Sequence, residues 1–186
     1  MSNPMPAQPV KLIFSILAGE EGLLNETINT LSRYYGPPDY ISAKMSFDYT
    51  DYYCSEMGGN LFRRFMTMEK LIKAEMLPDI KLATNEVEGK SAKNKQRQVN
   101  IDPGYIAAAH LILATGKGFT HRPYLRDGIY ADLTLIFQKG EFASLPWTYA
   151  DYAEEKQIAM FGKIRAKYLL QLKQEQPLIL TARKVI

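Results

Sequence analysis

The chain has 186 residues, of which 46% are hydrophobic, and its 23 basic and 20 acidic residues leave a formal net charge of +3. This composition excludes a disordered chain and predicts one globular domain, and such a balanced charge does not by itself indicate a nucleic-acid-binding protein. The single cysteine, Cys54, excludes an internal disulfide. Because no signal peptide or long apolar run is evident either, we expect a cytoplasmic protein without a membrane partner.

The first half of the chain predicts strands around one helix. Residues 1–9 contain three prolines and predict a flexible leader. The continuous apolar run at 10–18 predicts a buried strand, and apolar residues at helical spacing predict a helix over 20–36, which ends before two prolines. We expect a second strand at 39–47, and the segment 61–72 begins as a third.

The second half predicts a helix followed by three strands. Proline stands at a helix-start position in the segment 78–93, where we expect a helix. A short strand at 96–102 is predicted to end in an Asp-Pro-Gly turn. The run at 109–116 fits a strand or a helix, and we favour a strand. In 128–137, apolar residues alternate with more polar ones, which is typical of a strand with one buried face.

The C-terminal part predicts one long helix. A short strand is expected in the sequence FASLPW, after which apolar residues line one face of a helix over 152–173. Asp151 and Glu154 match the pattern of an N-terminal capping box. We expect residues 176–186 to form a tail, with an edge strand as one alternative.

These elements predict a single α+β domain over residues 10–175. The order of strands and helices favours a mixed, mostly antiparallel sheet with helices packed on one side. It also favours a ferredoxin-like core, extended by extra strands and a C-terminal helix.

The loop with the sequence TGKGFTHR concentrates hydrogen-bond donors. It does not match a Walker A phosphate loop, because the distal glycine position holds Leu111 and a glycine follows Lys117. Two glycines still allow the backbone to approach an anion closely, and Lys117, His121 and Arg122 supply donors. An anion site is one hypothesis, and a hairpin with solvated cations is the other.

Two predicted strands carry polar side chains at alternate positions. Asn100 and Asp102 alternate along one strand, and Tyr130, Asp132 and Thr134 along the other. If both strands belong to one sheet, these side chains form a surface that is either open to water or the floor of a ligand site. Acidic groups beside the cationic loop would tune one another's ionisation, as groups in active sites often do.

The leading hypothesis is a protein, enzyme or not, that binds a phosphate-bearing small molecule such as a nucleotide. Lys117, Arg122 and Arg63 would hold the anion. The other candidate ligand-binding residues are Asn100, Tyr105, Thr120, Tyr124, Tyr130, Thr134 and Trp147.

The catalytic form of this hypothesis assigns roles to three residues. His121 would be the general acid/base, and Asp102 or Asp132 would orient it or bind Mg²⁺. In the alternative, His121 bonds a neighbouring carbonyl or tyrosine, and Asp102 belongs to a turn.

Other side chains also suggest metal or aromatic sites. Asp51 and Glu56 are candidate Mg²⁺ ligands, although such residues also cap short helices. No zinc site is expected, because one cysteine and two histidines do not supply a usual structural set. Trp147, Tyr149 and Tyr152 either wall a pocket or anchor the last helix.

Two other classes of function remain as alternatives. An RNA-binding module would stack bases on the sheet face and contact phosphates through the basic helix at 163–173. A non-catalytic homo-oligomeric scaffold would cover its exposed sheet face with a second copy.

Four stretches of the sequence are long and specific: FDYTDYYCSEMG, KLATNEVEG, VNIDPGYIAAAHLILATGKGFTHRPYLRDGIYADLTLIF and LPWTYADYA. Over residues 10–175 they resemble an uncharacterised prokaryotic family catalogued as domain of unknown function 4416. The resemblance implies no established activity, substrate or catalytic residue, although some members are labelled GTP-binding proteins. Asp132 stands where the family is expected to have an acidic residue, often glutamate.

Overall fold

The computed structural model describes residues 3–182, with side chains through residue 174. This part of the chain forms an α+β fold with four α-helices and one nine-stranded sheet. The strands are β1 (Val10–Ala18), β2 (Pro38–Ile41), β3 (Met45–Phe47), β4 (Leu61–Ile72), β5 (Val99–Ile106), β6 (His110–Thr115), β7 (Tyr124–Arg126), β8 (Ile129–Gln138) and β9 (Glu141–Ser144). The helices are α1 (Glu21–Tyr35), α2 (Cys54–Met57), α3 (Leu77–Ser91) and α4 (Glu155–Ala182), with 3₁₀ turns η1 (Asp51–Tyr53) and η2 (Ala74–Met76).

The predicted α+β class with a mostly antiparallel sheet is confirmed. Neighbouring strands follow the order β2-β4-β1-β5-β6-β8-β7, with β3 paired to β4 and β9 to β8, and every pair is antiparallel. The strands predicted at 10–18, 109–116 and 128–137 and the helices at 20–36 and 78–93 are confirmed to within about two residues. The ferredoxin-like core stays a prediction.

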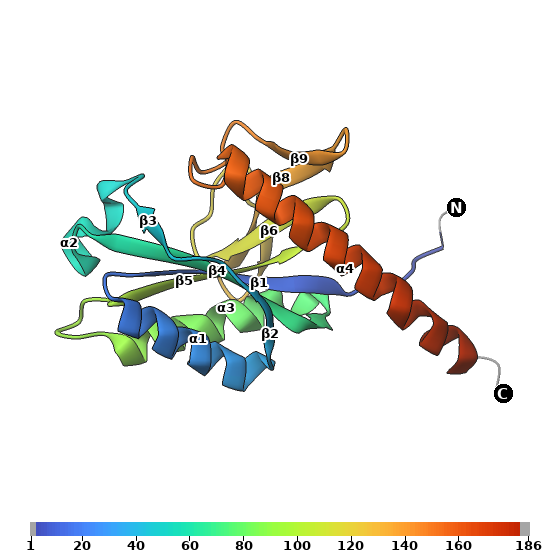
Figure 1. Cartoon of the computed structure of the whole chain (residues 1–186), viewed down its shortest axis with the longest axis horizontal. Helices are drawn as coiled ribbons and strands as arrows, with labels where there is room; N and C mark the ends of the chain where they lie inside the picture. The colour runs from blue at the N-terminus through green and yellow to red at the C-terminus, as the bar shows by residue number, and fades with distance from the viewer. Residues whose placement is uncertain (1–2, 183–186) are drawn as a thin grey trace.

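Helices cover both faces of the sheet, which differs from the predicted one-sided packing. Figure 1 shows α1 and α3 together on one side of β1, β4 and β5, whereas α4 crosses the other side. All nine residues of β1 are buried as a result. A strand with both faces covered has no polar side to show, which explains the continuous apolar run in its sequence.

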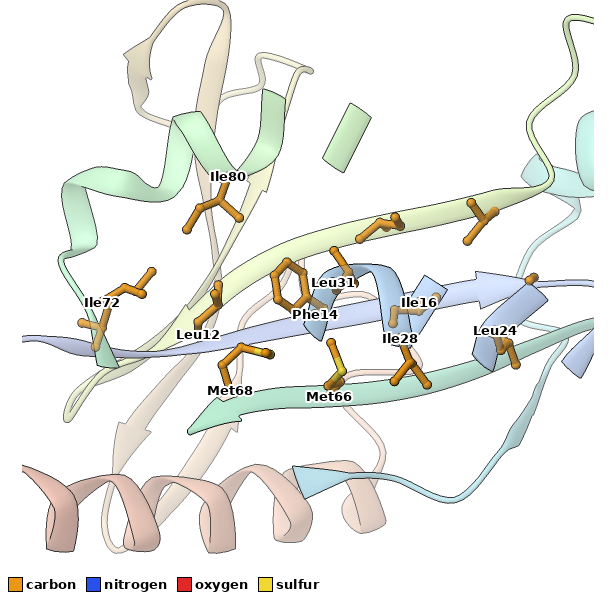
Figure 2. Packing of buried hydrophobic residues seen from close by; sticks show 14 residues of the cluster. Leu12, Phe14, Ile16, Leu24, Ile28, Leu31, Met66, Met68, Ile72 and Ile80 are labelled. Carbon is orange, nitrogen blue, oxygen red and sulfur yellow. The ribbon is translucent and has the colours of Figure 1, made fainter. Parts of the chain in front are cut away.

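The larger core cluster lies between β1 and the helix pair. Leu12 and Phe14 of β1 are buried in one cluster with Leu24, Ile28 and Leu31 of α1, and Figure 2 shows Phe14 beside Leu31. The three α1 residues recur at spacings of three and four, so they occupy one helix face. On the opposite sheet face, a second cluster packs residues of β1 and β4 against α4; its members include Ile13, Phe65, Phe161 and Ile164.

Several element boundaries differ from the predictions. The strand expected at 39–47 is two short strands, β2 and β3, and the segment 61–72 is one long strand. The edge strand proposed for the tail is wrong for residues 176–182, which continue α4, and residues 183–186 lie outside the described part. None of the described helices has the length and apolarity needed to cross a membrane.

The Asp-Pro-Gly turn predicted after residue 101 is wrong, because β5 runs straight through these residues. Pairing of β5 with β1 continues along Asp102, Pro103 and Gly104. Pairing with β6, on the other side, ends at Gly104 and Leu113. Pro103 has no main-chain N–H and so removes a donor that the next step of this ladder would use. Beyond that point β5 and β6 separate.

At Gly104, β5 and β6 lie so close together that a side chain does not fit between them. A Cβ atom at this position would lie 2.3 Å from the main-chain oxygen of Ile112. We expect Gly104→Ala to lower the free energy of unfolding by about 1–3 kcal/mol, measured by urea denaturation. Gly162→Ala is the matched control, because a Cβ atom there meets nothing within 4 Å inside α4, and it should stabilise by about 0.5–1 kcal/mol. Equal effects of the two variants would contradict the tight β5–β6 contact.

Candidate functional site

A cavity of about 560 Å³ lies where β5 and β6 separate. Five residues predicted for the site line this cavity, although they come from distant parts of the chain. They are Arg63 of β4, Asn100 and Asp102 of β5, Lys117 of the loop after β6, and Asp132 of β8.

The register of the sheet places the polar residues of β5 and β8 on one face. Leu113 of β6 pairs with both Gly104 of β5 and Asp132 of β8. Asn100 and Asp102 are in phase with Gly104 along β5, so their side chains point to the same side as Asp132. The two polar strand faces therefore meet across β6 instead of pairing directly.

Helix α3 adds two charged residues that the sequence analysis missed. Lys81 Nζ donates to the main-chain oxygen of Ile101 at 2.9 Å, and Glu88 accepts from the Ile101 N–H at 2.6 Å. These side chains satisfy main-chain groups of β5 in a stretch where β6 no longer pairs. Lys81 and Glu88 lie seven residues apart, and hence on one face of the helix. The sequence alone could have indicated this, because the predicted helix at 78–93 carries Lys81 and Glu88 on one face.

Arg97 connects the cavity floor to the segment that precedes β4. Its guanidinium donates to both carboxylate oxygens of Glu56, at 3.0 and 2.7 Å, and to Asn100 Oδ1 at 2.8 Å. Asn100 in turn donates to Asp102 at 2.7 Å. The hydrogen bond from Arg97 lowers the pKa of Glu56, so this predicted metal ligand is ionised and already paired with a cation.

Asp51, the other predicted metal ligand, lies beside Cys54. Its carboxylate accepts only a long contact from Cys54 Sγ at 3.7 Å. Within residues 3–174, no three Asp, Glu, His or Cys side chains are grouped as metal ligands would be.

Arg63 forms a buried ion pair with Asp151, and each side chain is only 7% exposed. The guanidinium also lies over the ring of Phe47 at 4.4 Å and near that of Tyr152 at 5.4 Å. The predicted capping role of Asp151 is wrong, because α4 begins at Glu155 and the carboxylate pairs with Arg63. Arg63 therefore lines the cavity with its charge already compensated.

Arg122 ties the loop after β6 to β8. Its Nε donates to Asp132 at 2.8 Å, and its terminal nitrogens donate to the Tyr149 hydroxyl at 2.7 Å and to the main-chain oxygen of Lys117 at 3.2 Å. Because each guanidinium nitrogen donates to the protein, Arg122 fixes the loop, and it does not line the cavity.

His121 lies beside Asp132 but does not line the cavity. Its Nε2 is 3.7 Å from Asp132 Oδ2, and its ring stacks on Trp147 with centroids 4.8 Å apart. Trp147 donates to the main-chain oxygen of Leu133 at 2.8 Å, which holds this stack against β8. In this arrangement His121 can influence a ligand only through Asp132, and Trp147 does not wall the cavity.

Five other predicted ligand-binding residues do not line the cavity. Tyr105 packs against the core on the α1 and α3 face. Tyr124 and Tyr130 contact each other, with ring centroids 5.3 Å apart. Thr120 is exposed, and Thr134 is buried with its hydroxyl bonded to the main-chain oxygen of Asp132.

Four tyrosines give the cavity aromatic walls. Tyr149 and Tyr152, which were predicted as possible walls, line it together with Tyr52 and Tyr53, which were missed. Burial raises the pKa of Tyr53 and of Tyr149, so both hydroxyls are protonated at neutral pH.

Lys117 differs from the other cations that line the cavity. Its Nζ donates to the Tyr52 hydroxyl at 2.6 Å and lies 4.2 Å from the centre of that ring, and this hydrogen bond lowers the pKa of Tyr52. Among the described residues, no carboxylate oxygen lies within 4 Å of Lys117 Nζ, whereas Arg63, Lys81 and Arg97 each have one. The positive charge of Lys117 is thus not compensated by an ion pair.

Comparison with known proteins identifies the family. A family model described as "Domain of unknown function (DUF4416)" matches residues 8–168. The chain belongs to the DUF4416 family. No curated protein and no solved structure matches it. The DUF4416 match includes every residue that lines the cavity.

The Arg63–Asp151 pair gives a test of the corrected role of Asp151 in this DUF4416 domain. Asp151→Asn leaves a buried guanidinium without its counter-charge, and we expect a loss of about 3–5 kcal/mol in the free energy of unfolding. Loss of a helix cap alone would cost about 1 kcal/mol. Asp79→Asn, which breaks the exposed pair with Arg126, is the control and should cost much less. A small effect at both positions would disprove the structural role of the buried pair.

Glu88 gives the DUF4416 domain a pH-dependent stability. Burial raises the pKa of Glu88 and outweighs the nearby Lys81 charge. The pKa of an unfolded-state glutamate is about 4.3, and below that pH the protonated side chain is buried without penalty. As the pH rises through the higher pKa of the folded state, ionisation of Glu88 makes the folded state less stable. We therefore expect the stability of Glu88→Gln relative to the wild type to increase as the pH rises from acidic to neutral, measured by urea denaturation. Exposed Glu86 on the same helix is the control, and its Gln variant should not follow this trend.

Proposed function

We propose that the cavity binds a small molecule carrying a phosphate group, with Lys117 as the residue that contacts the phosphate. The observation that carries this proposal is the tyrosine-walled space at which Asn100, Asp102, Lys117 and Asp132 converge. Its volume of about 560 Å³ is in the range typical of small-molecule sites.

The pattern of charges supports a phosphate with low total charge. Arg63, Lys81 and Arg97 are each within ion-pair distance of a carboxylate, so the cavity walls largely neutralise themselves. Lys117 also lines the cavity, at its exposed rim, and among the described residues no carboxylate lies within ion-pair distance of it. One uncompensated lysine suits a phosphate monoester better than a triphosphate, which would also meet the repulsion of the carboxylates.

Asp102 is the carboxylate best placed to meet a bound molecule. Its side chain is 29% exposed, whereas that of Asp132 is only 4% exposed and is engaged by Arg122. If the protein hydrolyses or transfers the phosphate, Asp102 acts as the base or binds Mg²⁺ together with the phosphate. In that case Asp132 and His121 act as positioning residues behind it.

The RNA-binding and scaffold alternatives have less structural support. The sheet face on which RNA bases would stack is packed against α4, with Ile13 and Phe65 buried. The same packing leaves little bare sheet for a second copy to cover. A cytoplasmic location, which we infer from the single cysteine, fits the proposed ligand class.

Lys117→Ala tests the proposed function directly. We expect it to weaken binding of phosphate monoesters roughly ten- to hundredfold, because a charge-assisted hydrogen bond is lost. Isothermal titration calorimetry with a panel of sugar phosphates and nucleoside monophosphates is the measurement, and Lys70→Ala, at an exposed position on β4, is the control. If no phosphate compound binds the wild type, or if both variants bind equally well, the proposal fails.

A further inference from the structure

The edge of β6 that faces the cavity carries main-chain groups that no strand pairs with. The Ala107 N–H donates to the His110 oxygen at 2.9 Å, so Ala107 and His110 are a hydrogen-bonded pair. Hydrogen-bonded and non-hydrogen-bonded pairs alternate along an antiparallel ladder, and this bond therefore shows which residues of β6 face β5 with their N–H and C=O groups. In this alternation Ala114 and Gly116 are the next two residues whose N–H and C=O groups point toward β5. The pairing of β5 and β6 ends before both of them, at Gly104 and Leu113.

β5 supplies a partner for only one of these groups. Opposite Ala114 the register places Pro103, whose carbonyl can accept from the Ala114 N–H but which has no N–H to donate, so the Ala114 carbonyl has no partner on β5. Opposite Gly116 it places Ile101, whose N–H and C=O are bonded to Glu88 and Lys81 of α3. The edge of β6 therefore faces the cavity and not another strand.

Ala114 and Gly116 place this edge in the wall of the cavity. Both residues line the cavity, Gly116 at an exposed position and Ala114, 2% exposed, at a buried one. The other edge of β6 is paired with β8 as far as Thr115 and Tyr130, so the strand is held in place. A rigid strand edge offers a fixed row of donors and acceptors, which an amide or a heterocyclic ring can match with its own acceptors and donors.

The walls around this edge suit a flat, uncharged group. Tyr53, Tyr149 and Tyr152 line the same cavity, and aromatic rings of this kind can stack on a planar ligand. The nearby cations Arg63 and Lys81 are paired with carboxylates, so the inner cavity presents little net charge. Lys117 follows Gly116 directly in the chain, which places the proposed phosphate contact next to this edge.

We infer that the ligand is a phosphate monoester that also carries a planar heterocyclic ring with adjacent donor and acceptor atoms, as in a nucleoside monophosphate. The ring pairs with the main chain of Ala114 and Gly116, and the phosphate lies at Lys117. This inference rests on the proposed function and adds the chemical class of the second half of the ligand.

Wild-type protein tests the inference with four kinds of probe. Calorimetry would compare the common nucleoside monophosphates, the corresponding nucleosides, ribose 5-phosphate and inorganic phosphate. We expect at least one nucleoside monophosphate to bind about tenfold more tightly than ribose 5-phosphate, since each 1.4 kcal/mol of added interaction is a factor of ten. If ribose 5-phosphate binds as tightly as every nucleoside monophosphate, the inference is wrong and the proposed function stands. If nucleosides bind as tightly as their monophosphates, the ring site stands and the proposed function is wrong. No binding by any probe contradicts both.

Substitutions at the β6 edge show whether the main chain is responsible. Gly116→Pro removes one N–H, and Gly116→Ala is its control, because a Cβ atom there meets nothing within 4 Å. We expect the proline variant to lose the preference for the nucleoside monophosphate while its affinity for ribose 5-phosphate is unchanged, and the alanine variant to keep both. Pro103→Ala is a second variant, since its new N–H competes for the Ala114 carbonyl, and it should reduce the same preference. If folded variants at both positions keep the full preference, the main-chain contact is refuted.

Discussion

The site depends on the point at which the main-chain ladder between β5 and β6 stops. A proline inside a central strand normally weakens a sheet, because it removes one hydrogen bond. Here Pro103 keeps β5 paired with β1 on one side and releases it from β6 on the other. Gly104, directly after it, lets the two strands approach closely up to that point. The sheet therefore opens abruptly, and side chains of α3 take over hydrogen bonds that a strand partner would have made.

The opened sheet exposes charged residues that could not be buried singly. An ionised group inside a protein is tolerated only when it is paired and hydrogen-bonded. Arg63 meets Asp151, Arg97 meets Glu56, and Lys81 lies 3.6 Å from Asp102. The cost of keeping this polar space inside the fold is thus offset locally, pair by pair. What remains for recognition is the uncompensated lysine at the rim, the accessible Asp102 carboxylate and the main chain of β6.

The sequence predicted the elements well where a continuous apolar run or a strict alternation marked a strand, as in 10–18 and 128–137 respectively. It also predicted that Asn100 and Asp132 would share a surface, since alternation along each strand fixes which side chains point together. The Asp-Pro-Gly sequence was misleading, because these residues favour turns locally and the β1 pairing that overrides this preference is a long-range contact. Ion-pair partners such as that of Asp151 were beyond reach for the same reason: the partner lies 88 positions earlier on β4, and no local pattern links the two.

The segment that carries η1 and α2 adds a last constraint, because several of its contacts with the cavity rim are between side chains at or near the surface. Tyr49 bonds Glu154, Tyr52 accepts from Lys117, and Glu56 holds Arg97. Exposed contacts of this kind contribute little each. Arg97 nevertheless bonds Asn100, and Lys117 is the proposed phosphate contact, so two of the residues that hold the segment also belong to the ligand site. A phosphate that draws Lys117 away from Tyr52 would weaken one of these contacts, and ligand binding and the position of the segment are therefore coupled.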